Sequence, residues 1–306
     1  MKTLVAGGAG FVGSWLCEKL LESNEVACLD NFSTGRKQNV GHIKSKEFSR
    51  IDADVTKSIK MEANVIFHLA SPASPADYQK KPIETMMANS EGTKNLLELA
   101  RKNDATFLLA STSEIYGDPL EHPQKETYWG NVNPTGPRSC YDEAKRFAEA
   151  LTTAYHNAYG IDTKIIRIFN TYGPRMRRDD GRLIPNLITQ ALAGKPLTVY
   201  GSGKQTRSFC YVKDLVEGIA AVAFSKHSGE AFNLGNPDEH SVIDIAEKIK
   251  ALVDRKLKLE FLPLPQDDPR RRKPDIAKVK SMVGWKPSTS LADGLAETIV
   301  YFRKTK

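Results

Sequence analysis

The sequence predicts an α/β fold in which a doubly wound parallel sheet is joined to a smaller C-terminal domain. Strand-like and helix-like stretches alternate through the first half of the chain, and a glycine-rich turn joins the first strand to the first helix. After about residue 171, glycine, proline and arginine become frequent. Repeated alternation of strands and helices is typical of a parallel sheet with helices on both faces.

The elements of the first half follow from the spacing of apolar residues. Six apolar runs are interpreted as strands, at 3–7, 25–30, 47–55, 64–70, 105–111 and 163–170. Helical spacing marks the intervening stretches 13–23, 85–102 and 142–159. Gly160 follows the last of them, where glycine commonly caps a helix. We therefore expect a nucleotide-binding domain at residues 1–171.

The second half has longer polar connections and fewer strands. Helical spacing remains at 183–193, 213–226, 241–254 and 290–303. We expect residues 172–306 to form mainly a substrate-binding domain that closes over the first. Part of 205–225 is expected to pack back on the first domain.

Composition limits the partners. The 306 residues carry a net charge of +7, which fits a solvated surface, with an anionic ligand as the alternative. Lysine and arginine are scattered apart from one cluster at 270–273, so we expect no nucleic acid partner. No apolar run is long enough to cross a membrane, and the four cysteines lack metal-binding spacing. We expect a cytoplasmic protein without a metal or a membrane partner.

A glycine pattern at the first turn predicts a dinucleotide site of the Rossmann type. Gly7, Gly10 and Gly13 lie between the first strand and the first helix, where small residues let the backbone approach a pyrophosphate. Asp30 ends the second strand, 20 residues after Gly10, and can accept both ribose hydroxyls of an adenosine. Because this carboxylate would repel a 2′-phosphate, NAD is the predicted cofactor. Arg36 and Lys37 lie nearby, so NADP is the alternative.

Further residues at the same strand ends are assigned to the cofactor. Asp54 and Val55 follow the third strand and can hold the adenine, with a simple capping role for the aspartate as the alternative. The other expected cofactor contacts are Phe11, Val12, Asn31, Phe32, Thr34, Gly35, Leu69, Ala70 and Ser71.

The candidate catalytic residues lie in the segments "ASTSEIYG" (110–117) and "YDEAK" (141–145). Tyr141 and Lys145 are four residues apart and share one helix face, where the ammonium would favour the phenolate. Taken alone, this spacing is also typical of a solvent-exposed tyrosine–lysine pair without a catalytic role. Thr112 follows the fifth strand and is expected to bond the same substrate oxygen as Tyr141. The three residues predict a hydride-transfer site in which Tyr141 is the base and NAD accepts the hydride.

The chain resembles the extended short-chain dehydrogenases/reductases that act on nucleotide sugars, the NAD-dependent epimerase/dehydratase family. More narrowly, it is similar to the members that decarboxylate UDP-glucuronate. The resemblance covers essentially the whole chain. The stretches that carry it are "GGAGFVGS", "DNFSTGRKQNV", "HLASPASPADY", "LLASTSEIYGDPLEHPQ", "YWGNVNPTGPRSCYDEAKR", "RIFNTYGPRM", "LTVYGSGKQTRSFCYVKDL", "NLGNPDEH" and "QDDPRRRKPDI".

The resemblance implies a reaction that begins and ends with the cofactor. C4 of the sugar is oxidised, CO2 leaves from the 4-keto intermediate, C5 is protonated, and bound NADH reduces C4 again to give UDP-xylose. Thr112, Tyr141 and Lys145 match the redox residues of the family. Glu114 matches an acid used in the ring and decarboxylation steps, and Arg272 an arginine that assists proton delivery at C5.

The resemblance also implies a UDP-sugar site and a homodimer. Helices 85–102 and 142–159 are the expected dimer contacts. The residues that match substrate contacts are Ala73, Tyr78, Arg138, Asn170, Arg182, Tyr200 and Arg207.

Other outcomes remain open within the family. A 4,6-dehydratase normally has Thr-Asp-Glu where this chain has Thr112-Ser113-Glu114, and a serine is a poor general acid. A 4-epimerase usually lacks an acid at position 114, and a catalytically silent NAD-binding protein would not need the Thr, Tyr and Lys set. Ile184, Pro185 and Gln266 depart from the decarboxylase pattern.

Overall fold

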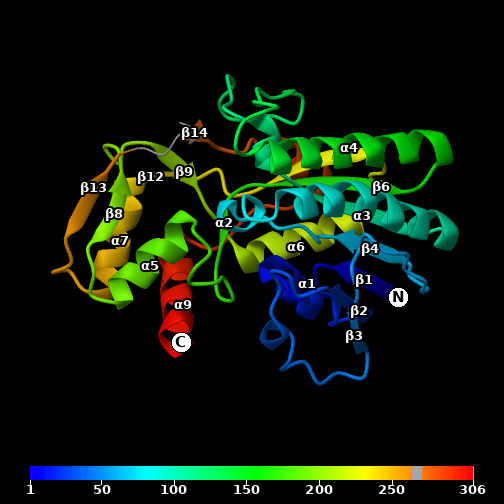
Figure 1. Ribbon diagram of the computed structural model, residues 1–306, viewed down its shortest axis with the longest axis horizontal. Helices are drawn as coiled ribbons and strands as arrows, with labels where there is room; N and C mark the ends of the chain where they lie inside the picture. The colour runs from blue at the N-terminus through cyan, green and yellow to red at the C-terminus, as the bar shows by residue number, and fades with distance from the viewer. Residues whose placement is uncertain (264–270, 306) are drawn as a thin grey trace.

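The computed structural model describes residues 1–263 and 271–305 and contains one large, entirely parallel sheet (Figure 1). Gln266 lies outside the described residues. The strand order is β11-β6-β5-β4-β1-β2-β3. All six strands predicted for the first half belong to it, and the edge strand β11 was not predicted. The bounds are β1 Lys2–Ala6, β2 Glu25–Asp30, β3 Phe48–Asp52, β4 Val65–His68, β5 Thr106–Thr112, β6 Thr163–Ile168 and β11 Glu230–Leu234.

Helices cover both faces of this sheet (Figure 1). Val5 on β1 packs with helices α1 (Phe11–Leu20) and α6 (Val212–Ala223). Leu4 and Ala6, on the opposite face of the same strand, pack with α3 (Pro82–Asn103) and α4 (Ser139–Tyr159). Because side chains alternate across a strand, an uninterrupted apolar run is what a sheet buried on both faces requires.

Several segments beyond residue 171 also pack on the large sheet. β11 pairs with β6 in parallel, and α6 packs against α1. Helix α8 (Ala277–Val283) contributes Val279 to the same core, together with Trp285. The domain boundary at residue 171 stays a proposal. Within it, later segments such as β11, α6 and α8 complete the first domain.

The second lobe has its own apolar core between α5 (Leu183–Leu192), α7 (Val242–Val253) and α9 (Leu291–Lys304). A two-stranded parallel sheet, β8 (Leu197–Tyr200) with β13 (Leu259–Leu262), lies against these helices (Figure 1). Ser241 and Asp244 form a capping box at the start of α7, so this helix begins where its sequence predicts.

The remaining elements are short, and several of them carry residues of the site described below. They are η1 Lys37–Asn39, α2 Pro75–Tyr78, η2 Ser113–Tyr116, β7 Thr171–Tyr172, β9 Thr206–Ser208, β10 Cys210–Tyr211, β12 Glu239–Ser241 and β14 Arg271–Arg272. β14 pairs with β9, which places Arg272 opposite Arg207. None of the helices described has both the length and the apolar character needed to cross a membrane.

Candidate active site

The first turn forms a cradle that only small residues allow. Gly7 has a φ of +82°, which is unfavourable for a residue with a side chain. A Cβ on Gly13 would lie 2.1 Å from the carbonyl oxygen of Gly7. Gly10 caps α1 without a side-chain hydrogen bond, and the first turn of α1 has no acidic residue. The exposed amide groups at this helix end therefore fit the pyrophosphate of a dinucleotide.

Asp30 is held rigidly at the end of β2. Its carboxylate accepts hydrogen bonds from the backbone N–H of Ala9 at 2.9 Å and of Phe32 at 2.8 Å. Burial raises the pKa of Asp30, and the two N–H groups oppose this rise. A Cβ on Gly35 would come within 2.7 Å of the carboxylate oxygens, so glycine keeps this face of Asp30 open. The fixed carboxylate fits the ribose hydroxyls of NAD.

The cavity beside Asp30 has the composition expected for an adenosine site. Asn31, Thr34, Gly35, Leu69, Ala70 and Ser71 line it, as do Gly7, Gly10, Asp54 and Val55. Asp54 accepts hydrogen bonds from Asn31 and from the backbone N–H of Thr56. It therefore both caps the turn that follows and lines the cavity. Arg36 and Lys37 form ion pairs with Asp179 at 3.6 Å and Asp52 at 3.8 Å, which compete with binding of a 2′-phosphate.

Replacement of Asp30 tests this assignment. Asp30→Asn keeps the shape of the side chain but removes a charged acceptor, so we expect NAD affinity to fall by about tenfold to a hundredfold. Titration with NAD and NADP measures the loss for each cofactor. Asp52→Asn, at the end of the next strand, is the matched control for the NAD titration. Unchanged NAD affinity in Asp30→Asn would contradict the ribose contact.

Thr112 both caps η2 and belongs to the catalytic cavity. Its hydroxyl oxygen accepts a hydrogen bond from the N–H of Glu114 at 3.2 Å. It is also within hydrogen-bonding reach of the side chain of Tyr141, an interaction that lowers the pKa of the tyrosine. The turn from β5 into η2 thus brings Thr112 beside Tyr141, as the sequence predicts. Thr112, Ser113 and Glu114 all line the same cavity.

Tyr141 and Lys145 share one face of α4 and are both buried. The Lys145 ammonium donates a hydrogen bond to the carbonyl oxygen of Ala110 at 2.7 Å and lies 5.8 Å from the centroid of the Tyr141 ring. Burial lowers the pKa of Lys145 to about 7, and the charge of Glu149 opposes this.

The pKa of Tyr141 is shifted in the direction opposite to the one expected from its lysine neighbour. Lys145 was expected to lower the pKa of the phenol. Instead burial, and then the negative charge of Glu114, raise it. These groups therefore favour the neutral phenol.

Tyr78 lies behind Tyr141 and lines neither of the two cavities. It is fully buried, and its ring stacks on that of Tyr141 with centroids 4.9 Å apart and an interplanar angle of 3°. This stacking supports the Tyr141 ring, and the substrate contact of Tyr78 stays a prediction. Ala73, from the same segment, lines the cavity, and its contact with the sugar stays a prediction.

Glu114 is the centre of a charged cluster. Arg138, directly before α4, forms an ion pair with one oxygen of its carboxylate, and Arg272 approaches the other at 3.4 Å. Burial alone would raise the pKa of Glu114, but the charges of Arg138 and Arg272 outweigh burial and lower it. Arg138, expected near the substrate carboxylate, is engaged by Glu114 in this structure.

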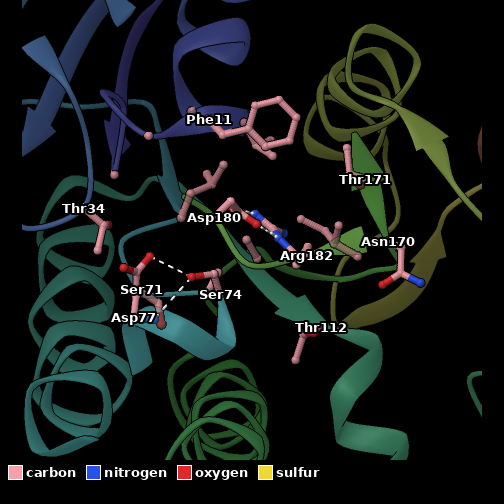
Figure 2. Close-up of a pocket in the computed structure, with 18 of the residues that line it drawn as sticks. Phe11, Thr34, Ser71, Ser74, Asp77, Thr112, Asn170, Thr171, Asp180 and Arg182 are labelled. Carbon is pink, nitrogen blue, oxygen red and sulfur yellow. Dashed lines mark hydrogen bonds and ion pairs between the residues drawn. The ribbon is translucent and has the colours of Figure 1, made fainter. Parts of the chain in front are cut away.

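The remaining substrate candidates fall into two groups. Asn170 and Arg182 line the catalytic cavity, where Arg182 pairs with Asp180 between Phe11 and Thr112 in the view of Figure 2. Tyr200, which ends β8, and Arg207 on β9 do not line either of the two cavities described above. A uridine-diphosphate contact for these two residues stays a prediction.

Sequence reasoning missed several polar residues of the cavity. Ser74 caps α2 and donates a hydrogen bond to Asp77 (Figure 2). Asp77 also forms an ion pair with Arg177 at 2.7 Å. The Ser-Pro pair at 74–75 is a recognisable helix start, but nothing in the sequence indicates a partner 100 residues away. The other polar lining residues that were not predicted are Asn39, Ser111, Thr171, Arg175 and Asp180.

A dinucleotide cradle joined to a Thr, Tyr and Lys set at the carboxyl ends of parallel strands defines an NAD-dependent enzyme of the short-chain dehydrogenase type. The chain belongs to the NAD dependent epimerase/dehydratase family, whose sequence profile matches residues 3–235.

Relatives of known name support a narrower grouping. The chain is 53% identical over 305 residues to UDP-glucuronic acid decarboxylase 1 of Arabidopsis thaliana, covering 99% of this chain and 70% of the relative. The identity to UDP-glucuronic acid decarboxylase 1 of Xenopus tropicalis is also 53%, covering 99% of this chain and 72% of the relative.

Solved structures of several activities share the fold. UDP-glucuronic acid 4-epimerase from Bacillus cereus, in complex with UDP-glucuronic acid and NAD, is 30% identical, with a TM-score of 0.89 over all of both chains. dTDP-glucose 4,6-dehydratase from Bacillus anthracis, in complex with NAD, is 26% identical, with a TM-score of 0.88 over 100% of this chain and 97% of that chain. The fold therefore fixes the cofactor class and leaves the outcome of the reaction to local residues.

Proposed function

We propose that this chain decarboxylates UDP-glucuronate to UDP-xylose with tightly bound NAD. The observation that carries the proposal is the Glu114–Arg272 contact beside Thr112 and Tyr141 in one cavity. An acid–guanidinium pair next to a redox site suits a reaction that must protonate a carbon between oxidation and reduction. Relatives named as decarboxylases, at about half identity over the full chain, support the same substrate.

The oxidation step uses residues at the end of β5 and on α4. Oxidised NAD would supply the hydride acceptor for C4 and favour ionisation of Tyr141 by its positive charge, and its reduced form would return the hydride. Tyr141 takes the proton of the C4 hydroxyl, and Thr112 holds the same oxygen in place. Lys145 is the cation on the same helix face that stabilises the phenolate before it takes this proton.

The decarboxylation step follows from the 4-ketone. The bond between C5 and C6 breaks, its electron pair passes to the C4 oxygen, and CO2 leaves. Tyr141 can donate a hydrogen bond to that oxygen, and a proton must then reach C5. Arg272, fixed against the ionised Glu114, is placed to orient the water that delivers it. Return of the hydride to C4 by the reduced cofactor would complete the cycle.

Ser113 separates this proposal from loss of water. A dehydratase needs an acid to protonate the departing C6 hydroxyl, and Ser113 is a buried hydroxyl that lines the cavity. A 4-epimerase is the second candidate, because the neighbour from Bacillus cereus contains the same sugar nucleotide, UDP-glucuronic acid, in the same fold.

One incubation distinguishes these outcomes. The protein is mixed separately with UDP-glucuronate, UDP-glucose, UDP-galactose and dTDP-glucose, and the products are followed by mass spectrometry. We expect CO2 and UDP-xylose from UDP-glucuronate alone. An isomer of unchanged mass would support the epimerase, loss of water the dehydratase, and release of a 4-keto-pentose would contradict the final reduction.

We also propose a homodimer built from α3 and α4. The two helices pack together on one face of the large sheet and leave apolar side chains exposed, including Ile83 and Met86 on α3 and Phe147 and Tyr159 on α4. Exposed apolar residues gathered on neighbouring helices mark interaction surfaces.

The substitution Phe147→Arg tests the dimer. A two-fold interface would contain the new charge twice, so we expect the dimer dissociation constant to rise by about a hundredfold. Light scattering at micromolar concentration gives the mass. Phe261→Arg is the control, because Phe261 on β13 is 54% exposed against 51% for Phe147 and lies in the other lobe. A wild-type monomer would contradict the proposal.

A cytoplasmic location is proposed from the cysteines. Cys17, Cys28, Cys140 and Cys210 are all free thiols. Free thiols are typical of a reducing compartment.

A further inference from the structure

Asp142 is a buried carboxyl group that the proposed mechanism does not use. It occupies the first turn of α4, directly after Tyr141, and is 7% exposed. Its side chain lies within hydrogen-bonding reach of the Glu114 carboxyl group. Its Oδ1 atom is buried and has no hydrogen-bond partner within residues 1–263 and 271–305. Two carboxyl groups therefore meet beside the catalytic tyrosine.

The two arginines near these carboxyl groups form ion pairs with Glu114, and no described ion pair involves Asp142. Arg138 and Arg272 each contact an oxygen of Glu114. The groups that act on Asp142 from the packed elements are Glu114 on η2, Arg138 before α4, Arg272 on β14, Tyr78 on α2, and Cys140 and Tyr141 beside it in the chain. Glu114 thus carries the stable negative charge, while Asp142 faces it without an ion pair of its own among the described contacts.

Two touching carboxyl groups cannot both be ionised at low cost, because like charges at this distance repel strongly in a buried site. One proton shared between them converts the repulsion into a hydrogen bond. We propose that Asp142 carries this proton and donates a hydrogen bond to Glu114, acting as the positioning residue that holds Glu114 against Arg272. The role of the pair in decarboxylation rests on the proposed function; the shared proton itself does not.

The pKa values agree with this geometry. Burial, followed by the negative charge of Glu114, raises the pKa of Asp142 to about 8, whereas the two arginines lower that of Glu114. At pH values below about 8 the proton is present and the hydrogen bond is made. As the pH rises through this value the proton leaves, the carboxylates repel, and Glu114 loses its support. Turnover of the wild-type protein should therefore fall as the pH rises above about 8.

The test compares Asp142→Asn, Asp142→Ala and Glu143→Gln. The asparagine can still donate a hydrogen bond to Glu114 but cannot ionise. We expect it to keep most of the turnover near neutral pH and to lose the alkaline fall. The alanine removes the donor, and its decarboxylation rate should drop by about tenfold to a hundredfold while C4 oxidation in a single turnover is retained. Glu143, which pairs with Arg146 on the same helix, is the matched control and should leave both rates unchanged.

A measurement without substrate keeps the inference independent of the proposed function. Infrared spectra of the free protein at neutral pH should contain a protonated-carboxyl band that disappears in Asp142→Asn and persists in Glu143→Gln. If the band is present but the protein does not turn over UDP-glucuronate, the shared proton would be supported and the proposed function refuted. A spectrum unchanged by Asp142→Asn would overturn the shared proton. Equal loss of decarboxylation in the asparagine and alanine variants, with an unaltered pH profile, would overturn the positioning role.

Discussion

The substitution Tyr141→Phe should abolish oxidation of the sugar and leave dinucleotide binding intact. The phenol oxygen is the only group lost, and removal of a positioned proton acceptor costs a reaction about a hundredfold to ten-thousandfold. The stacking ring of Tyr78 should keep the phenylalanine in the same plane, so the loss reports chemistry and not packing. Absorbance of reduced cofactor in a single turnover measures the effect directly.

A second tyrosine on α4 provides the control for this experiment. Tyr155 donates a hydrogen bond to Glu98 at 2.8 Å, away from the cavity, and Tyr155→Phe removes an equivalent hydroxyl. Oxidation by this variant should match the wild type. Measurable oxidation by Tyr141→Phe at the wild-type rate would exclude Tyr141 as the base.

The substitution Arg272→His should separate the two halves of the reaction. C4 oxidation depends on β5 and α4, which remain intact, whereas Glu114 loses the guanidinium that approaches it at 3.4 Å. We expect reduced cofactor and a 4-keto sugar to accumulate, with UDP-xylose formation slowed by about a hundredfold or more. Rapid-quench mass spectrometry identifies the accumulated species.

Two further variants make this result specific. Arg255→His changes an exposed arginine of the second lobe and should leave product formation unaltered. Glu114→Ala removes the partner of Arg272 and should lead to the same accumulated species. Full turnover in Glu114→Ala would show that the acid has no role. Equal loss of oxidation and decarboxylation in Arg272→His would show that Arg272 acts on binding alone.

The core of the sheet is predictable because its strands are buried on both faces. Such strands read as continuous apolar runs, and each is separated from the next by a helix or turn of recognisable composition. β11 was missed because its five residues, "EAFNL", mix acidic and amide groups with apolar ones at the sheet edge. Asn233 in this strand accepts a hydrogen bond from the buried hydroxyl of Tyr116, a contact that no local pattern indicates.

The site was predictable where its members are close in the chain. The spacing of Tyr141 and Lys145 follows from helix geometry, and the glycine cradle follows from its place between strand and helix. Contacts between distant segments could not be predicted in this way, as for Asp77 with Arg177 and for Asp142 with Glu114. The position of Arg272 was expected only from the family resemblance, since two residues of strand carry no periodicity.

The short strand that carries Arg272 has a consequence for how such proteins diversify. β14 is two residues long and pairs with β9, outside the large sheet, whereas the residues proposed to assist C4 oxidation belong to β5 and α4. In the proposed mechanism, substitutions near β14 or at Ser113 would therefore change the fate of the oxidised sugar and leave the large sheet intact. An ancestral oxidising scaffold could thus give rise to epimerases, dehydratases and decarboxylases by changes at its margin.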